Sequence, residues 1–123
     1  PCSPFLDKND LVSISSKSKK LKKPILTISP YPAPLNWSFE VKNHRVMNVN
    51  QKKMRNDKLS KKKHFYDAGQ VYCLPSNYLN KKNFNFKDNI STYELPLVKS
   101  VDIDTIHDWK LAETIYRGLH SKK

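Results

Sequence analysis

The feature that most constrains the fold is an abrupt change of hydrophobic period near the C-terminus. Apolar and acidic residues alternate from Val101 to Asp104, which is the period of a strand with one buried face. Directly afterwards, apolar residues recur at spacings of three and four, which predicts a helix. Thr105 and Asp108 stand where a capping box would begin that helix. A strand that runs straight into an amphipathic helix favours an α/β layer architecture.

The predicted C-terminal helix carries one apolar stripe, and we expect this stripe to pack on a mixed sheet. Its members are Ile106, Trp109, Ala112, Ile115, Tyr116 and Leu119. Asp7 and Asp10 predict the capping box of a first helix, which we expect to fray in the Ser/Lys stretch that follows. Short apolar segments bounded by turn residues predict strands at 25–29, 68–74 and 92–98, and a short helix is expected at 75–82.

An antiparallel excursion interrupts this pattern. Residues 37–49 alternate on either side of a turn at Asn43 and His44, which predicts a hairpin. The proline-rich segment before it is expected to be rigid and extended. The basic stretch 51–63 has no apolar period and reads as a loop or a weak helix. We therefore expect one domain over the 123 residues, with an excursion at about 36–64.

Composition limits the kind of site that the chain can build. It contains 2 Gly, so a Gly-rich phosphate loop is excluded, and phosphate must be bound by side chains or helix N-termini. The net charge of +12 suggests an anionic partner. The lysines gather in runs without interleaved aromatic residues, so a nucleic-acid-binding module is the less favoured alternative to a nucleotide or an acidic sugar.

Cysteine usage and hydropathy indicate the compartment. Cys2 and Cys73 stand apart from each other and from any histidine at ligand spacing, which argues against a zinc site and a disulfide framework. No apolar run approaches the ~18 residues of a membrane span, and there is no signal-peptide pattern. A cytoplasmic chain without a membrane partner is expected.

The two acids of the predicted C-terminal strand form the first candidate site. Asp102 and Asp104 would share one strand face, at the end where open α/β sheets bind ligands. Such a pair can hold Mg²⁺, which also engages substrate phosphates. The alternative is a polar edge in which Asp104 only favours the dipole of the next helix.

Two further segments could contact a ligand. In "DAGQ", Ala68 and Gly69 allow close approach, and Gln70 can donate and accept hydrogen bonds to hydroxyl or N-acyl groups. In "PCSP", Cys2 or Ser3 could touch a ligand. The alternatives are an ordinary turn into a strand and a plain loop.

These segments occur in an order that resembles the acylneuraminate cytidylyltransferase family. The similar segments are "PCSPFLDKNDL", "YDAGQVY" and "VDIDTIHDWKLAETIY". The stretch "YPAPLNWSFEVKNHRVMNVN", followed by "MRNDKL", resembles the branch of the family that activates pseudaminic acid. The resemblance runs over essentially the whole chain, and its last two motifs are fairly specific together.

The resemblance implies a partial nucleotidyltransferase with a Rossmann-like, glycosyltransferase-A-type mixed sheet. Such enzymes transfer CMP from CTP to a nonulosonic acid of the pseudaminic or sialic type, an acidic nine-carbon sugar, and release pyrophosphate. The anomeric hydroxyl attacks the α-phosphorus, and Mg²⁺ neutralises the developing charge. The resemblance further implies a homodimer in which an inserted region reaches the partner, and the hairpin is the candidate for that arm.

The resemblance also assigns roles to residues. Metal binding falls to Asp102 and Asp104, and no catalytic residue is implied beyond them. The substrate-binding positions are Cys2, Ser3, Arg55, Asp67, Gln70 and Tyr72. Arg55 stands at the family's motif arginine, which could pair with a carboxylate, although its spacing to "DAGQ" differs from that of the family.

The chain departs from the family pattern at several places. Cys2 stands where the family usually has Thr, Cys73 replaces a Trp, and the Gly-, Arg- and Lys-containing loop that holds the CTP phosphates is absent. We therefore expect the C-terminal part of a cytidylyltransferase, without activity of its own. The alternative is a non-catalytic remnant that serves interaction or dimerisation.

Overall fold

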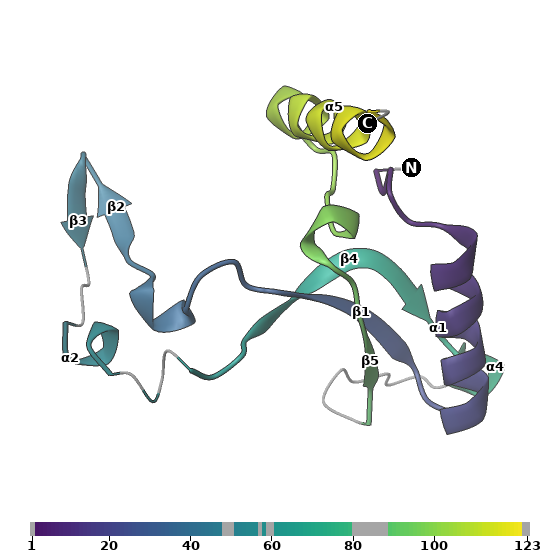
Figure 1. Cartoon of the computed structure of the whole chain (residues 1–123). Coiled ribbons are helices and arrows are strands. Elements are labelled where there is room, and N and C mark those ends of the chain that lie inside the picture. The colour runs from purple at the N-terminus through teal and green to yellow at the C-terminus, as the bar shows by residue number, and fades with distance from the viewer. Residues whose placement is uncertain (1, 48–50, 57, 59–60, 80–88, 122–123) are drawn as a thin grey trace. The chain divides into compact units, whose positions relative to one another are not determined.

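The computed structural model describes residues 2–47, 51–56, 58, 61–79 and 89–121 (Figure 1). The chain divides into two units, and each is described by itself. One unit comprises Pro1–Ser29 with Asp67–Lys123, and the other comprises Pro30–Tyr66. None of the helices in the described ranges is long and apolar enough to cross a membrane.

A mixed three-stranded sheet organises the first unit. Its strand order is β4-β1-β5, with β1 at Ile25–Pro30, β4 at Phe65–Cys73 and β5 at Ser91–Glu94. β1 and β5 are parallel, whereas β4 runs in the opposite direction to β1 (Figure 1). The hydroxyl of Thr27 joins β1 to β4, because Oγ1 donates to Val71 O at 3.1 Å and accepts from Val71 N at 3.0 Å. The expected α/β class with a mixed sheet is confirmed.

The core of this unit is small. Its buried apolar side chains, among the residues that the structure describes, are Ile14, Ile25, Ala68, Leu95 and Ala112. β1 alternates between buried and half-buried positions, and two of its buried side chains are Thr27 and Ser29. Ser29 Oγ donates to Leu95 O at 3.1 Å, so burial of this hydroxyl leaves no donor unsatisfied.

The first helix, α1, spans Lys8–Leu21. It begins as predicted, because the Asp7 carboxylate accepts from the backbone N–H of Asp10 while the Asp10 carboxylate accepts from Asp7 N. The expected fraying is wrong, since the helix continues through the Ser/Lys stretch. Ile14 and Ser18 are buried there, and Ser18 Oγ donates to Lys23 O at 2.9 Å. Burial of one face of the helix therefore outweighs the low helix propensity of the serines.

The last helix, α5, spans Ile106–His120 and has the predicted capping box of Thr105 and Asp108. Two expectations about this region are wrong. Residues 101–103 have no regular secondary structure and Asp104 lies in a bend, so no strand forms there. The apolar stripe does not pack on the sheet: Ala112 is buried, whereas Trp109 is 53% and Tyr116 57% exposed. Periodicity reveals which face of a helix is apolar, but it does not reveal what covers that face.

The stripe of α5 borders a cavity instead. This cavity of about 430 Å³ is lined by Pro4 and Phe5 of the N-terminal loop, by Ile103, and by helix residues that include Trp109 and Tyr116. The helix therefore meets the loop that begins the chain.

The strand predicted at 92–98 is shorter than expected, since β5 spans Ser91–Glu94. β5 ends two residues before Pro96, and the 3-10 helix η2 follows at Leu97–Lys99. The short helix α4 spans Ser76–Leu79 and starts as predicted, while the last residues expected in it lie outside the described residues.

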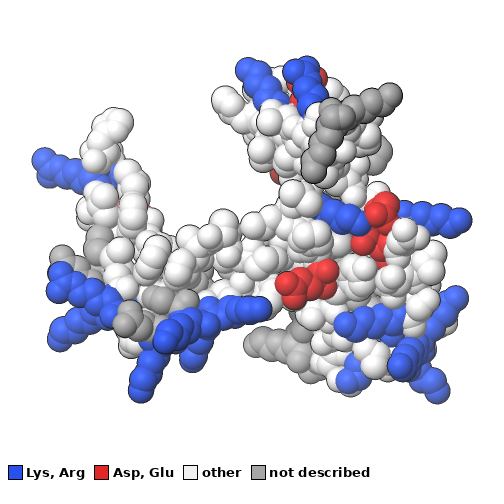
Figure 2. All heavy atoms as spheres, in the orientation of Figure 1, with Lys and Arg blue, Asp and Glu red and all other residues white. Residues whose placement is uncertain are grey.

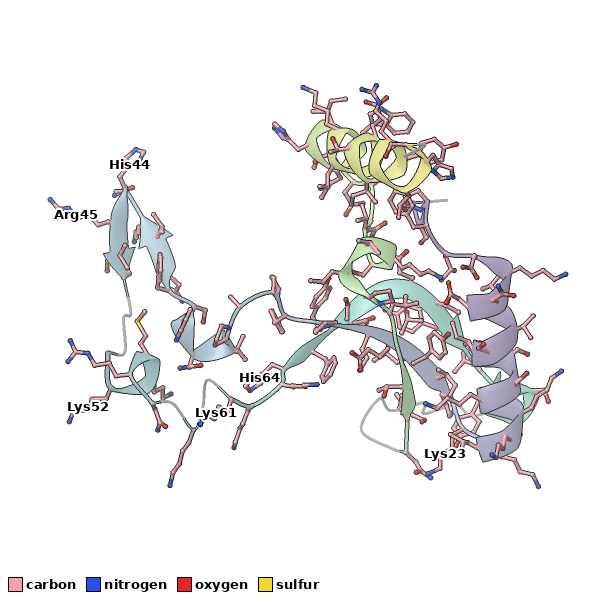
Figure 3. The ribbon with its side chains drawn as sticks, viewed as in Figure 1. Lys23, His44, Arg45, Lys52, Lys61 and His64 are labelled. Carbon is pink, nitrogen blue, oxygen red and sulfur yellow. The ribbon has the colours of Figure 1, made fainter. Side chains whose placement is uncertain are left out.

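The Pro30–Tyr66 unit contains the predicted hairpin. β2 at Glu40–Lys42 pairs antiparallel with β3 at Arg45–Met47. Asn43 and His44 connect them with φ of 49° and 61°, the positive values that a two-residue hairpin turn needs. The side chains of His44 and Arg45 extend from this end of the hairpin (Figure 3). The last residues of the predicted hairpin, 48–49, lie outside the described residues.

Two single-turn helices flank the hairpin. η1 spans Leu35–Trp37, so the proline-rich segment is not extended throughout, and α2 spans Gln51–Met54 within the basic stretch. Asn36 Nδ2 donates to Lys53 O at 2.8 Å, which ties one to the other.

Candidate functional site

The two predicted metal ligands lie on residues 101–104 between η2 and α5, here called the acid segment. Asp102 and Asp104 are exposed, whereas Val101 and Ile103 are half-buried, so the alternation of the sequence survives without a strand. Across the described residues, neither carboxylate takes part in an ion pair. Both acids are therefore open to a cation from solvent.

Backbone contacts hold this acid segment on both sides. Ile103 N donates to Cys2 O at 3.1 Å, which places the segment beside the loop of Cys2 and Ser3. Asp104 N donates to Asp108 Oδ2 at 3.3 Å, and the Thr105 hydroxyl donates to the same oxygen at 2.7 Å. These hydrogen bonds lower the pKa of the Asp108 carboxyl and keep it ionised at the helix N-terminus. The structure thus joins two of the predicted site segments, "PCSP" and "VDIDT".

An ion-pair cluster that the sequence does not predict lies at the other end of the acid segment. It consists of Lys99, Asp7 and Asp10 and is here called the Lys99 cluster. Lys99 Nζ contacts Asp7 Oδ2 at 2.6 Å and Asp10 Oδ2 at 2.7 Å. Tyr93 donates its hydroxyl to Asp10 Oδ1 at 3.4 Å. The two carboxylates raise the pKa of Lys99 to about 12, Asp10 contributing most, and the hydrogen bond from Lys99 lowers the pKa of Asp7. The sequence indicates only a helix-capping role for Asp7 and Asp10, and one lysine among many gives no signal of an ion pair.

The "DAGQ" segment lies in β4 and is organised around Asp67. Asp67 Oδ1 accepts from Gly69 N at 2.9 Å, and Oδ2 accepts from the Tyr72 hydroxyl at 2.5 Å, which raises the pKa of Tyr72. Gly69 has φ of +65°, a left-handed value within a strand. The carboxylate therefore fixes the shape of the strand in addition to any contact with a substrate.

Gln70 has a different position in the same segment. Its Nε2 donates to Ala68 O at 3.0 Å, which fixes the orientation of the amide. Its Oε1 is buried and has no hydrogen-bond partner among the described residues. The side chain therefore retains one acceptor, which a hydroxyl or N–H donor could satisfy after a small rearrangement.

Arg55 follows α2 in the Pro30–Tyr66 unit and is exposed. The other predicted site residues belong to the unit that contains the sheet, so the place of Arg55 in the site stays a prediction. Basic side chains are spread over the viewed face of both units rather than gathered in one patch (Figure 2).

The metal-ligating side chains of the described residues limit how the predicted Mg²⁺ could be bound. Within the described ranges, no group of three or more His, Cys, Asp or Glu could hold a metal. A cage made only of protein ligands is therefore not supported there. Mg²⁺ is commonly bound through one or two carboxylates together with waters and substrate phosphates, and two exposed, unpaired aspartates fit that arrangement.

Comparison with known proteins supports the resemblance read from the motifs. No protein-family model matches the chain. Two curated relatives are pseudaminic acid cytidylyltransferases from Campylobacter jejuni subsp. jejuni, one from serotype O:23/36 (strain 81-176) and one from serotype O:2 (strain ATCC 700819 / NCTC 11168). The chain is 27% identical to each over 119 residues, which is 95% of this chain and 51% of the relative. It thus spans about half the length of the curated relatives it matches. Along nearly all of its own length, the chain is similar to pseudaminic acid cytidylyltransferases.

Proposed function

We propose that this chain supplies the metal and sugar side of a cytidylyltransferase. The complete enzyme would transfer CMP from CTP to a nonulosonic acid and release pyrophosphate, on a Rossmann-like sheet of the glycosyltransferase-A type. The observation that carries the proposal is the similarity over 95% of the chain, which includes the exposed acids of "DIDT". The net charge of +12 favours association with two anionic substrates.

In this proposal, Asp102 and Asp104 hold Mg²⁺ together with the CTP phosphates. The bound metal would supply neutralisation of phosphate charge. The chain itself contributes position, because the acid segment is attached at Cys2 and at Asp108, and its carboxylates have no competing cation among the described residues. Positioning and electrostatics are the main contributions that phosphoryl-group chemistry asks of a protein.

The sugar would lie against the loop of Cys2 and Ser3 and against β4. Gln70 offers its acceptor to a sugar hydroxyl or an N-acyl N–H, and Asp67 with Tyr72 maintains the strand around it. Arg55 would pair with the sugar carboxylate.

The test uses the chain as it stands, labelled with ¹⁵N and titrated with pseudaminic acid and Mg²⁺–CTP. We expect the amide signals of residues 2–3, 69–72 and 102–105 to shift. Asp102→Asn and Asp104→Asn should remove the metal-dependent shifts without changing the fold, since Asn keeps the shape and removes the charge. Glu94→Gln, which changes an exposed acid on β5, is the matched control.

Turnover is measured in parallel as pyrophosphate release. We expect none above background, because this sequence contains no Gly-, Arg- and Lys-containing phosphate loop. Turnover would contradict the half-enzyme interpretation, and shifts confined to other residues would contradict the site.

The second candidate function is an interaction arm that joins two copies of the chain, with or without catalysis. The exposed apolar side chains of the hairpin formed by β2 and β3 support this second function. Val41 and Val46 are cross-strand partners, and they are 63% and 52% exposed. A two-stranded hairpin is at best marginally stable in water by itself, so a partner surface would stabilise it. A homodimer is the partner that the resemblance implies.

A further inference from the structure

The acid segment lacks the support that a sheet would give it. A strand is held by a ladder of backbone hydrogen bonds, but residues 101–104 form no strand. Two unpaired carboxylates on such a segment will bind a metal well only if other contacts keep them in place. What holds Asp102 and Asp104 is therefore a question of function as well as of stability.

The N-terminal loop supplies part of this support. Cys2 O accepts from Ile103 N at one end, and Asp7 accepts from Lys99 Nζ at 2.6 Å at the other. The residue numbers of the two contacts run in opposite order, so segments 2–7 and 99–103 are connected at both ends, Cys2 to Ile103 and Asp7 to Lys99. Ser3 and Asp102 lie between the ties. The predicted sugar loop and the first predicted metal ligand thus belong to two segments that are held together at their ends, here called the strip.

The tie at Lys99 is well built. Its ammonium group contacts two carboxylates at once, and the side chains of Lys99 and Asp10 are 27% and 9% exposed. Charge-assisted hydrogen bonds are among the stronger polar contacts, and partial burial limits their screening by salt. Asp7 also caps α1, so the tie connects the strip to the first helix.

We infer that Lys99 is a positioning residue for the proposed metal site, acting through Asp7 and Asp10. The inference rests on the proposed function of Asp102 and Asp104. Without the ammonium group, the neighbouring carboxylates of Asp7 and Asp10 would repel each other, and this end of the strip would open. The tie at Cys2 and the capping box of α5 would remain, so the loss should loosen the acid pair without unfolding the chain.

The experiment measures binding of Mn²⁺, a paramagnetic substitute for Mg²⁺, to the ¹⁵N-labelled full chain in the presence of CTP, because the proposed site shares its metal with substrate phosphates. In the unmodified chain, Mn²⁺ should broaden the amide signals of residues 102–105 first. Lys99→Met should raise the Mn²⁺ concentration needed for the same broadening several-fold, less than the about 10–100-fold that follows loss of a group bonded directly to a metal ligand. Lys99→Arg should restore most of the affinity, since a guanidinium can also bridge two carboxylates.

The matched control is Lys17→Met. Lys17 Nζ donates to Thr92 O at 2.7 Å, so this variant also removes a lysine contact between α1 and β5, but at a place away from the strip. A purely structural role of Lys99 would make the two variants alike in Mn²⁺ affinity. We expect Lys17→Met to bind Mn²⁺ as the unmodified chain does.

The outcomes separate the inference from the proposed function. If Mn²⁺ does not broaden residues 102–105 in the unmodified chain, the metal assignment fails and the inference with it. If it does, and folded Lys99→Met binds Mn²⁺ equally well, the inference alone is overturned. Should Lys99→Met not fold, Asp7→Asn decides: Asn still caps the helix but loses the ion pair, so a several-fold weaker affinity is expected, and an unchanged affinity refutes the role of the tie.

Discussion

Gly69 shows how one residue shapes the candidate sugar site. Its φ of +65° lies in the left-handed region, and the Asp67 carboxylate accepts from its N–H at 2.9 Å. The alternation of side-chain burial along β4 is broken at this point, because Ala68 is buried while the consecutive residues Gln70 and Val71 are both half-buried. Such an irregularity re-aims side chains along a strand. The sequence indicated close approach at this glycine, but it could not indicate the backbone angle, which depends on the strand beside it.

Gly69→Ala should therefore destabilise the chain by about 1–2 kcal/mol, the cost of a left-handed backbone for a residue with a Cβ. No heavy atom lies within 4 Å of where that Cβ would be, so the cost is one of backbone conformation and not of collision. Urea unfolding measures it. Gly118→Ala, also without a neighbour within 4 Å but inside α5, should instead stabilise by about 0.5–1 kcal/mol. Equal effects of the two substitutions would contradict this account.

At the scale of elements, the sequence predicts features that depend on neighbouring residues, but it does not predict which elements pack or pair with one another. Both capping boxes were predicted correctly because each depends on residues three apart, Asp7 with Asp10 and Thr105 with Asp108. The hairpin was likewise fixed by its own turn. The strand expected at 101–104 was wrong because a strand needs a neighbour, and alternation carries no information about one. The same limit explains why the stripe of α5 was placed on the sheet.

The Lys99 cluster predicts how stability depends on pH. The pKa of Asp7 is lowered from 3.8, so its contribution is present above that pH and is lost as pH falls further. The pKa of Lys99 is raised from 10.5 to about 12, so its contribution is complete below pH 10.5 and is lost as pH rises toward 12. The urea concentration at the midpoint of unfolding should therefore be constant at intermediate pH and should fall at both acid and alkaline pH.

Lys99→Met should remove the loss of stability that this cluster causes as pH rises from 10.5 toward 12. It should also reduce the loss of stability at acid pH. Part of the loss at acid pH should remain, because the pKa of Asp108 is also lowered by Thr105. Lys17→Met should keep the shape of the curve. A loss of stability of equal size at alkaline pH in Lys99→Met would show that another group causes it.

At the scale of the whole molecule, charge and exposed apolar surface act against each other. A net charge of +12 repels a second copy, whereas the apolar face of the hairpin attracts one. We expect a dimer that strengthens with protein concentration and with salt, since salt screens the repulsion. Analytical ultracentrifugation at several concentrations and ionic strengths measures this.

The double variant Val41→Ser and Val46→Ser should shift the chain to a monomer. Val12→Ser is the matched control, because Val12 is similarly exposed, at 55%, but lies on α1. A monomer at every concentration of the unmodified chain would contradict the interaction arm, and a dimer that persists in the double variant would place the interface elsewhere.

The strip formed by segments 2–7 and 99–103 has a consequence for how the chain matures. The contacts of Lys99 with Asp7 and Asp10 join residues 92 and 89 positions apart. Contacts of such long sequence separation form late, because the loop between them must close first. During synthesis, α1 and β1 leave the ribosome long before Lys99 does. We therefore expect the acid pair to be set in place late in folding, after elements that depend on local contacts, such as α1 and the hairpin of β2 and β3.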